Sequence, residues 1–99
     1  MFVRRINGRS MLPVLTPGQI VLGWKRTLTS GDLVLARQAG REVVKRVKSI
    51  ENSQAYLVGD NSIESQDSRH YGPVAFSDII GSIMIKLPIA LAPPKLVKP

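Results

Sequence analysis

Two side chains in this 99-residue chain, Ser10 and Lys45, could together carry out nucleophilic chemistry. A serine hydroxyl is a poor nucleophile until a neighbouring base takes its proton. A lysine amine can be that base if burial lowers its pKa by several units from the usual value of about 10.4. Val43 and Val47 would share a strand face with Lys45 and could exclude water from the amine. The pair predicts a serine protease whose general base is a lysine.

Both residues also have a plain structural interpretation. Ser10 could be a helix N-cap, where serine is preferred, and Lys45 could lie on the wet face of an edge strand. Against this, Met11 and Leu12 are apolar residues in a loop flanked by turn formers, which indicates a binding surface. Gly8 would let another backbone approach closely, which suits an oxyanion site.

A long polar loop in the second half of the chain carries a set of candidate supporting residues. Long ordered loops in compact domains are usually functional. Asp60 and Asn61 form a turn signal, and Asp67 and Arg69 are close enough in sequence to pair and hold the loop closed. Ser65 offers a second hydroxyl that could orient a neutral lysine by hydrogen bonding. We expect these residues to support the chemistry rather than perform it.

The composition limits the alternatives to this chemistry. The chain has no cysteine, which excludes disulfides and thiolate metal sites. His70 is the single histidine, so a multi-histidine metal site is excluded and His70 is the other candidate base. We interpret it as a surface residue, and we expect no metal and no cofactor.

The net charge of +7 is unevenly distributed, because ten of the 14 Lys and Arg but only two of the seven Asp and Glu lie in the first 50 residues. A basic half favours nucleic acid or an anionic membrane surface as a partner, although a solvated basic face is the simpler interpretation. No aromatic-rich basic motif is present, so no specific nucleic acid is expected. No segment approaches the roughly 18–20 apolar residues that span a bilayer. We expect a chain without a transmembrane segment, either cytoplasmic or peripheral to a membrane.

Short apolar runs separated by turn signals predict an all-β barrel or sandwich with almost no helix. The expected strands cover residues 3–6, 19–24, 33–37, 42–50, 55–58 and 79–87. One catalytic domain should therefore occupy residues 1–87. The four prolines in residues 88–99 predict an extended, weakly ordered C-terminal tail.

The chain resembles the type I signal peptidases, which are Ser-Lys dyad proteases. The resemblance rests on five segments in the family's order: residues 8–15, 17–22, 31–34, 43–47 and 59–72. The last segment, with its Gly-Asp-Asn start and Ser-Gln-Asp-Ser-Arg run, matches without a gap. In size and in this loop the chain is also similar to the small maturation peptidases of nickel superoxide dismutase. The implied fold is the small β-barrel core of signal peptidases and LexA-like proteins.

The resemblance implies a role for each candidate residue. Ser10 would be the nucleophile and Lys45 the general base, with Ser65 orienting the lysine amine. Asp67 and Arg69 would form a supporting ion pair. The Ser10 backbone N–H would contribute to the oxyanion hole.

The chain also departs from the family's pattern. Val14 and Gln19 replace a usual threonine and a common aspartate, and Gly8 lacks the oxyanion hydroxyl that some relatives carry at that position. The usual N-terminal membrane helices and second β-domain are not found in this sequence, which resembles a bare catalytic core.

The function expected from these observations is endopeptidase cleavage of signal peptides or pro-peptides. The substrate would bind as an extended strand beside Val43 and Val44, with peripheral membrane contact as a further expectation. One alternative is a LexA-like or catalytically weak relative that binds peptides. The other is a non-catalytic basic β-barrel that binds nucleic acid or anionic lipid.

Overall fold

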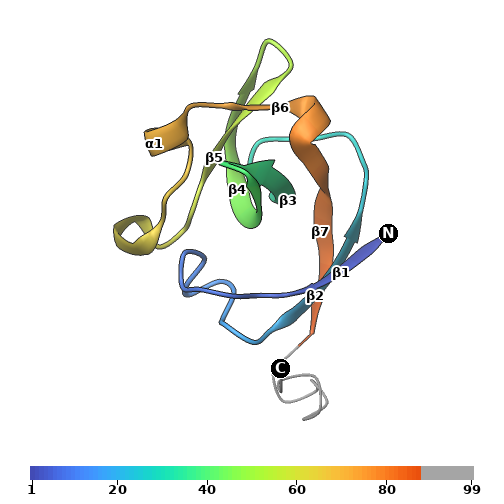
Figure 1. Cartoon of the computed structure of the whole chain (residues 1–99). Helices are drawn as coiled ribbons and strands as arrows, with labels where there is room; N and C mark the ends of the chain where they lie inside the picture. The colour runs from blue at the N-terminus through green and yellow to red at the C-terminus, as the bar shows by residue number, and fades with distance from the viewer. Residues whose placement is uncertain (88–99) are drawn as a thin grey trace.

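The computed structural model describes residues 1–87, which form one seven-stranded antiparallel sheet (Figure 1). Neighbouring strands lie in the order β1-β2-β7-β3-β4-β5-β6. The strands are β1 Phe2–Arg5, β2 Ile20–Trp24, β3 Leu33–Gln38, β4 Arg41–Glu51, β5 Gln54–Val58, β6 Val74–Ala75 and β7 Ile79–Leu87. The prediction of an all-β fold with little helix is confirmed. The expected tail at 88–99 lies outside the described residues, and the domain division at residue 87 stays a prediction.

The main core gathers apolar side chains from five of the strands, β3 to β7. In β5 the buried Ala55 and Leu57 alternate with the partly exposed Tyr56 and Val58, which is the period of a strand with one face inside. The core consists of Val34, Ala36, Val47, Ala55, Leu57, Val74 and Ile79.

A second apolar cluster positions the segment that carries Ser10. Met11 and Leu15 from this segment pack with Ile6 and Val21. Both ends of the segment are also tied together, because the Ile6 N–H donates to the Gln19 carbonyl at 2.7 Å. The long connection from β1 to β2 is therefore an anchored loop rather than a free one.

Two tight turns extend β4 beyond its expected ends. Ala39 and Gly40 both have positive φ, at 52° and 79°, as a two-residue hairpin turn of type I′ requires. Asn52 and Ser53 do the same between β4 and β5, with φ of 52° and 59°. These turns need only two residues each, so β4 reaches Arg41–Glu51 where residues 42–50 were expected.

Half of β4 has a free edge. β4 pairs with β3 over residues 41–46, but its pairing with β5 begins only at Arg46. Residues 41–45 therefore present one unpaired backbone edge within the described part of the chain. β1 also pairs on one side only, with β2. Unpaired strand edges accept an added strand readily.

The polar loop after β5 contains short helical turns that the sequence did not predict. They are the 3₁₀ turn η1, Ser62–Glu64, and the one-turn helix α1, Ser68–Tyr71; a further 3₁₀ turn, η2, covers Phe76–Asp78. Asp67 caps α1 by accepting from the Arg69 backbone N–H at 3.1 Å. Among residues 1–87, no helix is long and apolar enough to cross a membrane.

Candidate active site

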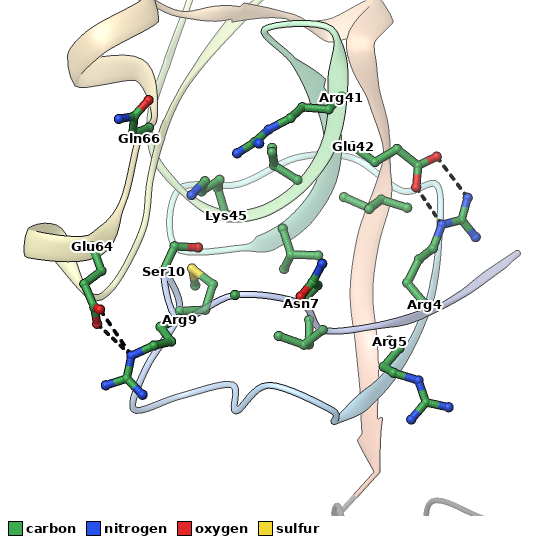
Figure 2. Close-up of a pocket in the computed structure, with 16 residues that line it drawn as sticks. Arg4, Arg5, Asn7, Arg9, Ser10, Arg41, Glu42, Lys45, Glu64 and Gln66 are labelled. Atoms are coloured by element: carbon green, nitrogen blue, oxygen red, sulfur yellow. Dashed lines mark hydrogen bonds and ion pairs between the residues drawn. The ribbon is translucent and has the colours of Figure 1, made fainter. Parts of the chain in front are cut away.

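A groove with a volume of about 450 Å³ lies along the free edge of β4 (Figure 2). Its walls come mainly from residues 4–11 on one side and residues 41–45 of β4 on the other, with the loop after β5 at one end. Ser10 and Lys45 both line it, and Figure 2 shows their side chains directed into the same space. The fold thus brings together two residues that lie 35 positions apart in the chain.

Ser10 lies in a turn that is held from two sides. Met11 anchors the turn from below, because its side chain is only 2% exposed and belongs to the second core cluster. Asn61 holds it from the loop side: its backbone N–H donates to the Ser10 carbonyl at 2.8 Å and its amide to the Arg9 carbonyl at 3.0 Å. The Ser10 backbone N–H donates to no group of residues 1–87, so a hydrogen-bond donor next to the hydroxyl stays available.

Two glycines shape the backbone around Ser10. Gly8 has φ of +84°, a conformation that favours glycine, and a Cβ there would meet nothing within 4 Å. At Gly59 the constraint is contact instead: a Cβ would overlap the Ser65 Oγ and lie 2.7 Å from the Ser10 carbonyl oxygen. The serine turn and the loop carrying Ser65 therefore come into contact at Gly59, where only a residue without a side chain fits.

The Lys45 amine is buried and hydrogen-bonded to a hydroxyl. The residue is 4% exposed, and its Nζ donates to the Ser65 Oγ at 3.0 Å. Within residues 1–87 the amine makes no hydrogen bond to the Ser10 Oγ, a contact that often tightens only when substrate binds.

Burial is the main cause that lowers the pKa of Lys45 below its usual value. The negative charge of Asp67 acts in the opposite direction and raises this pKa, while the charges of Arg41 and Arg69 lower it further. The net effect lowers the pKa, so the neutral amine, which is the form that can accept a proton, is easier to reach than in a solvated lysine.

Asp67 is fully buried and satisfied by several donors. Its carboxylate accepts from Ser65 Oγ at 2.6 Å and from the Gly59 backbone N–H at 2.7 Å. Arg69 adds an ion pair at 2.6 Å. Burial alone would raise the pKa of this carboxyl, but the hydrogen bonds from Arg69, Ser65 and Gly59 hold it well below the usual range. A charged carboxylate at this place directs the Ser65 hydroxyl proton toward itself, which leaves the Ser65 oxygen free to accept from Lys45.

Ser68 is a buried residue of this network to which the sequence assigned no role. Its hydroxyl accepts from the Leu57 backbone N–H at 2.9 Å and from Gln38 Nε2 at 3.3 Å. The loop is thereby fixed to β5 and to the end of β3. The only sequence signal was the position of Ser68 between Asp67 and Arg69 in the matching segment.

Asp60 acts on the strand that carries the lysine. It forms a two-bond ion pair with Arg46, at 2.9 and 2.8 Å, and Arg46 also donates to the Gly31 carbonyl. Although Arg46 is next to Lys45 in the sequence, Asp60 neutralises it, and the charges that lower the Lys45 pKa are those of Arg41 and Arg69.

The remaining candidates lie in different places. Val43 and Val44 line the groove, and so does the buried Met11. Leu12, which was expected on the same surface, is not among the lining residues. His70 is exposed on α1 and does not line the groove. No group of three or more His, Cys, Asp or Glu side chains suited to a metal ion occurs in residues 1–87.

A model of the Peptidase S24-like family matches residues 1–84, a range that includes the groove and the whole hydrogen-bonded network behind Lys45. The chain belongs to this family. The S24-like match confirms the predicted kinship with Ser-Lys peptidases and identifies a serine-peptidase type of domain. A search among curated proteins finds no match to this S24-like chain.

The Asp67→Asn substitution should destabilise the fold, because it removes the charge that Arg69, Ser65 and Gly59 surround. We expect a loss of about 3 kcal/mol in the free energy of unfolding at pH 7. Since the folded-state pKa of Asp67 is depressed, this stabilisation is present above the unfolded pKa of about 3.9 and is lost as the pH falls below it. Urea unfolding from pH 7 to pH 3 measures the difference. The exposed Asp78→Asn is the control, and a wild-type advantage that stays constant to pH 3 would contradict the assignment.

The Lys45→Met substitution tests whether the amine is truly desolvated. A lowered folded-state pKa means that the unfolded chain binds more protons, so wild-type stability should rise with pH up to the unfolded pKa of about 10.4. In Lys45→Met this increase should be missing. The measurement is the unfolding free energy of both chains from pH 6 to pH 10, with the exposed Lys48→Met as control. Parallel pH curves for wild type and Lys45→Met would show that the amine is solvated.

Proposed function

We propose that this chain is a serine endopeptidase in which Ser10 is the nucleophile and Lys45 the general base. The observation that carries the proposal is the buried, hydrogen-bonded Lys45 amine, with its lowered pKa, in the same groove as Ser10. A buried lysine without a structural ion pair is costly, and perturbed groups of this kind concentrate at functional sites.

The reaction follows from the roles of these groups. Neutral Lys45 takes the hydroxyl proton as Ser10 Oγ attacks the scissile carbonyl carbon. The free Ser10 backbone N–H would stabilise the developing oxyanion, and Gly8 adds no side-chain donor. The lysine then protonates the leaving amine, and a water molecule, activated by the same amine, hydrolyses the acyl-enzyme. Ser65 orients the lysine amine throughout, and Asp67 fixes the direction of the Ser65 hydroxyl.

The free edges beside the groove favour a peptide substrate in extended form. Residues 41–45 of β4 have an unpaired edge, and the segment around Ser10 lines the opposite wall. A strand added there would gain main-chain hydrogen bonds, while Val43 and Val44 would contact its side chains. The five segments shared with type I signal peptidases favour cleavage of a signal peptide or a pro-peptide.

A peptide-binding relative that does not cut is the second candidate function. The observation that favours it is Gly8, because the loss of one oxyanion donor can reduce the rate by about 10²–10³. An acyl-enzyme adduct on Ser10, detected as a mass increase after rapid acid quenching, would exclude this candidate.

Cleavage of a peptide library from pH 6 to pH 10 tests the dyad. We expect Ser10→Ala and Lys45→Ala each to lower kcat/KM by at least about a thousandfold, while the exposed His70→Ala has little effect. In the wild type, kcat/KM should rise with pH as Lys45 loses its proton, with an apparent pKa below the usual lysine value of about 10.4. Near-full turnover by Lys45→Ala would refute the assignment.

A further inference from the structure

The groove is lined by more arginine side chains than carboxylate side chains. Arg4, Arg5, Arg9 and Arg41 line it, together with only two carboxylates, Glu42 and Glu64. The ion pairs Arg4–Glu42, at 2.7 Å, and Arg9–Glu64, at 3.0 Å, engage both carboxylates. In Figure 2 the Arg5 guanidinium points away from Ser10 and Lys45.

Arg41 is left without a partner in the described part of the chain. Its guanidinium makes no hydrogen bond and no ion pair within residues 1–87, and the residue is exposed to solvent. On β4 it shares a face with Val43 and Lys45, because side chains alternate along a strand. Figure 2 shows its guanidinium extending toward Lys45 over the groove. Arg41 therefore presents a cation without a protein partner beside Lys45.

We propose that Arg41 is a specificity residue that binds an acidic side chain of the peptide substrate. A guanidinium matches a carboxylate with two parallel hydrogen bonds, a geometry that a neutral amide cannot reproduce with the same strength. No groove carboxylate competes for Arg41, because Glu42 and Glu64 are already paired. This inference rests on the proposed peptidase function and adds the chemical class of its substrate.

The spacing along β4 limits where the acidic residue lies. Arg41 and Lys45 are four residues apart, which is about 13 Å along a strand at roughly 3.3 Å per residue. The Arg41 side chain extends back toward Lys45, so it shortens this separation. The acidic residue should thus lie two to four positions from the scissile bond, on one side of it only.

The experiment is cleavage of a randomised peptide library, with the products sequenced by mass spectrometry. Wild type should prefer Asp or Glu over Asn or Gln about fivefold at one position near the cut, a size expected for an exposed ion pair. Arg41→Gln should abolish this preference, and Arg41→Glu should shift it to Lys and Arg. The matched control is Arg37→Gln, because Arg37 is an exposed arginine of β3 outside the groove and should not alter the preference.

Failure of this inference is distinguishable from failure of the peptidase function. Cleavage that depends on Ser10 and Lys45 but shows no acidic preference, or a preference that persists in Arg41→Gln, overturns the role of Arg41 alone. If no peptide is cut, the role of Arg41 is tested by measuring peptide affinity instead. The Ser10→Ala variant and the Ser10→Ala, Arg41→Gln double variant are each titrated with library peptides that contain Glu or Gln. Tighter binding of the Glu peptides that is lost with Arg41→Gln supports the proposal, and equal binding overturns it.

Discussion

Removal of the Lys45 amine from water sets the conditions for the rest of the site. A buried ammonium is costly, so the amine needs either a neutral state or a close counter-charge. The structure places a hydroxyl, Ser65, next to the amine and a carboxylate, Asp67, behind that hydroxyl. The carboxylate is itself fully buried and requires Arg69 and the Gly59 N–H to stay charged. The buried Lys45 amine thus accounts for a chain of polar contacts that runs through Ser65 and Asp67 to the partly exposed Arg69.

The sheet supports this arrangement by changing its pairing at the lysine. β4 pairs with β3 up to Arg46 and with β5 from Arg46 onward, so its strand partner changes at the residue after Lys45. Lys45 is therefore the last residue of β4 before its pairing with β5 begins. Its amine can be buried by the sheet and loop while the preceding residues stay open to the groove. The same strand carries the buried Lys45 and an unpaired edge beside the groove.

The sequence predicted the parts of the site that depend on residue type and local spacing. Lys45 between valines and Ser65 near Asp67 were recognisable without coordinates, as were the strands bounded by turn signals. Contacts that depend on how strands distant in the sequence are aligned could not be recognised from the sequence. The contribution of Arg41 rather than Arg46 depends on which strand face each occupies and on the Asp60 ion pair. Met11 looked like an exposed binding residue, but it is buried because the loop that carries it folds onto Ile6 and Val21.

The bare α-carbon of Gly59 has a consequence for how this site can change. The serine turn and the loop that carries Ser65 both pack against the main chain at Gly59, so a change at this position affects the two together. A methyl group added at Gly59 would overlap the Ser65 side chain and crowd the Ser10 carbonyl oxygen at the same time. A shift of the main chain that relieves one of these contacts would tighten the other. The Ser10 turn and the Ser65 loop are therefore linked through Gly59, and a redesign of either one must keep glycine at that position.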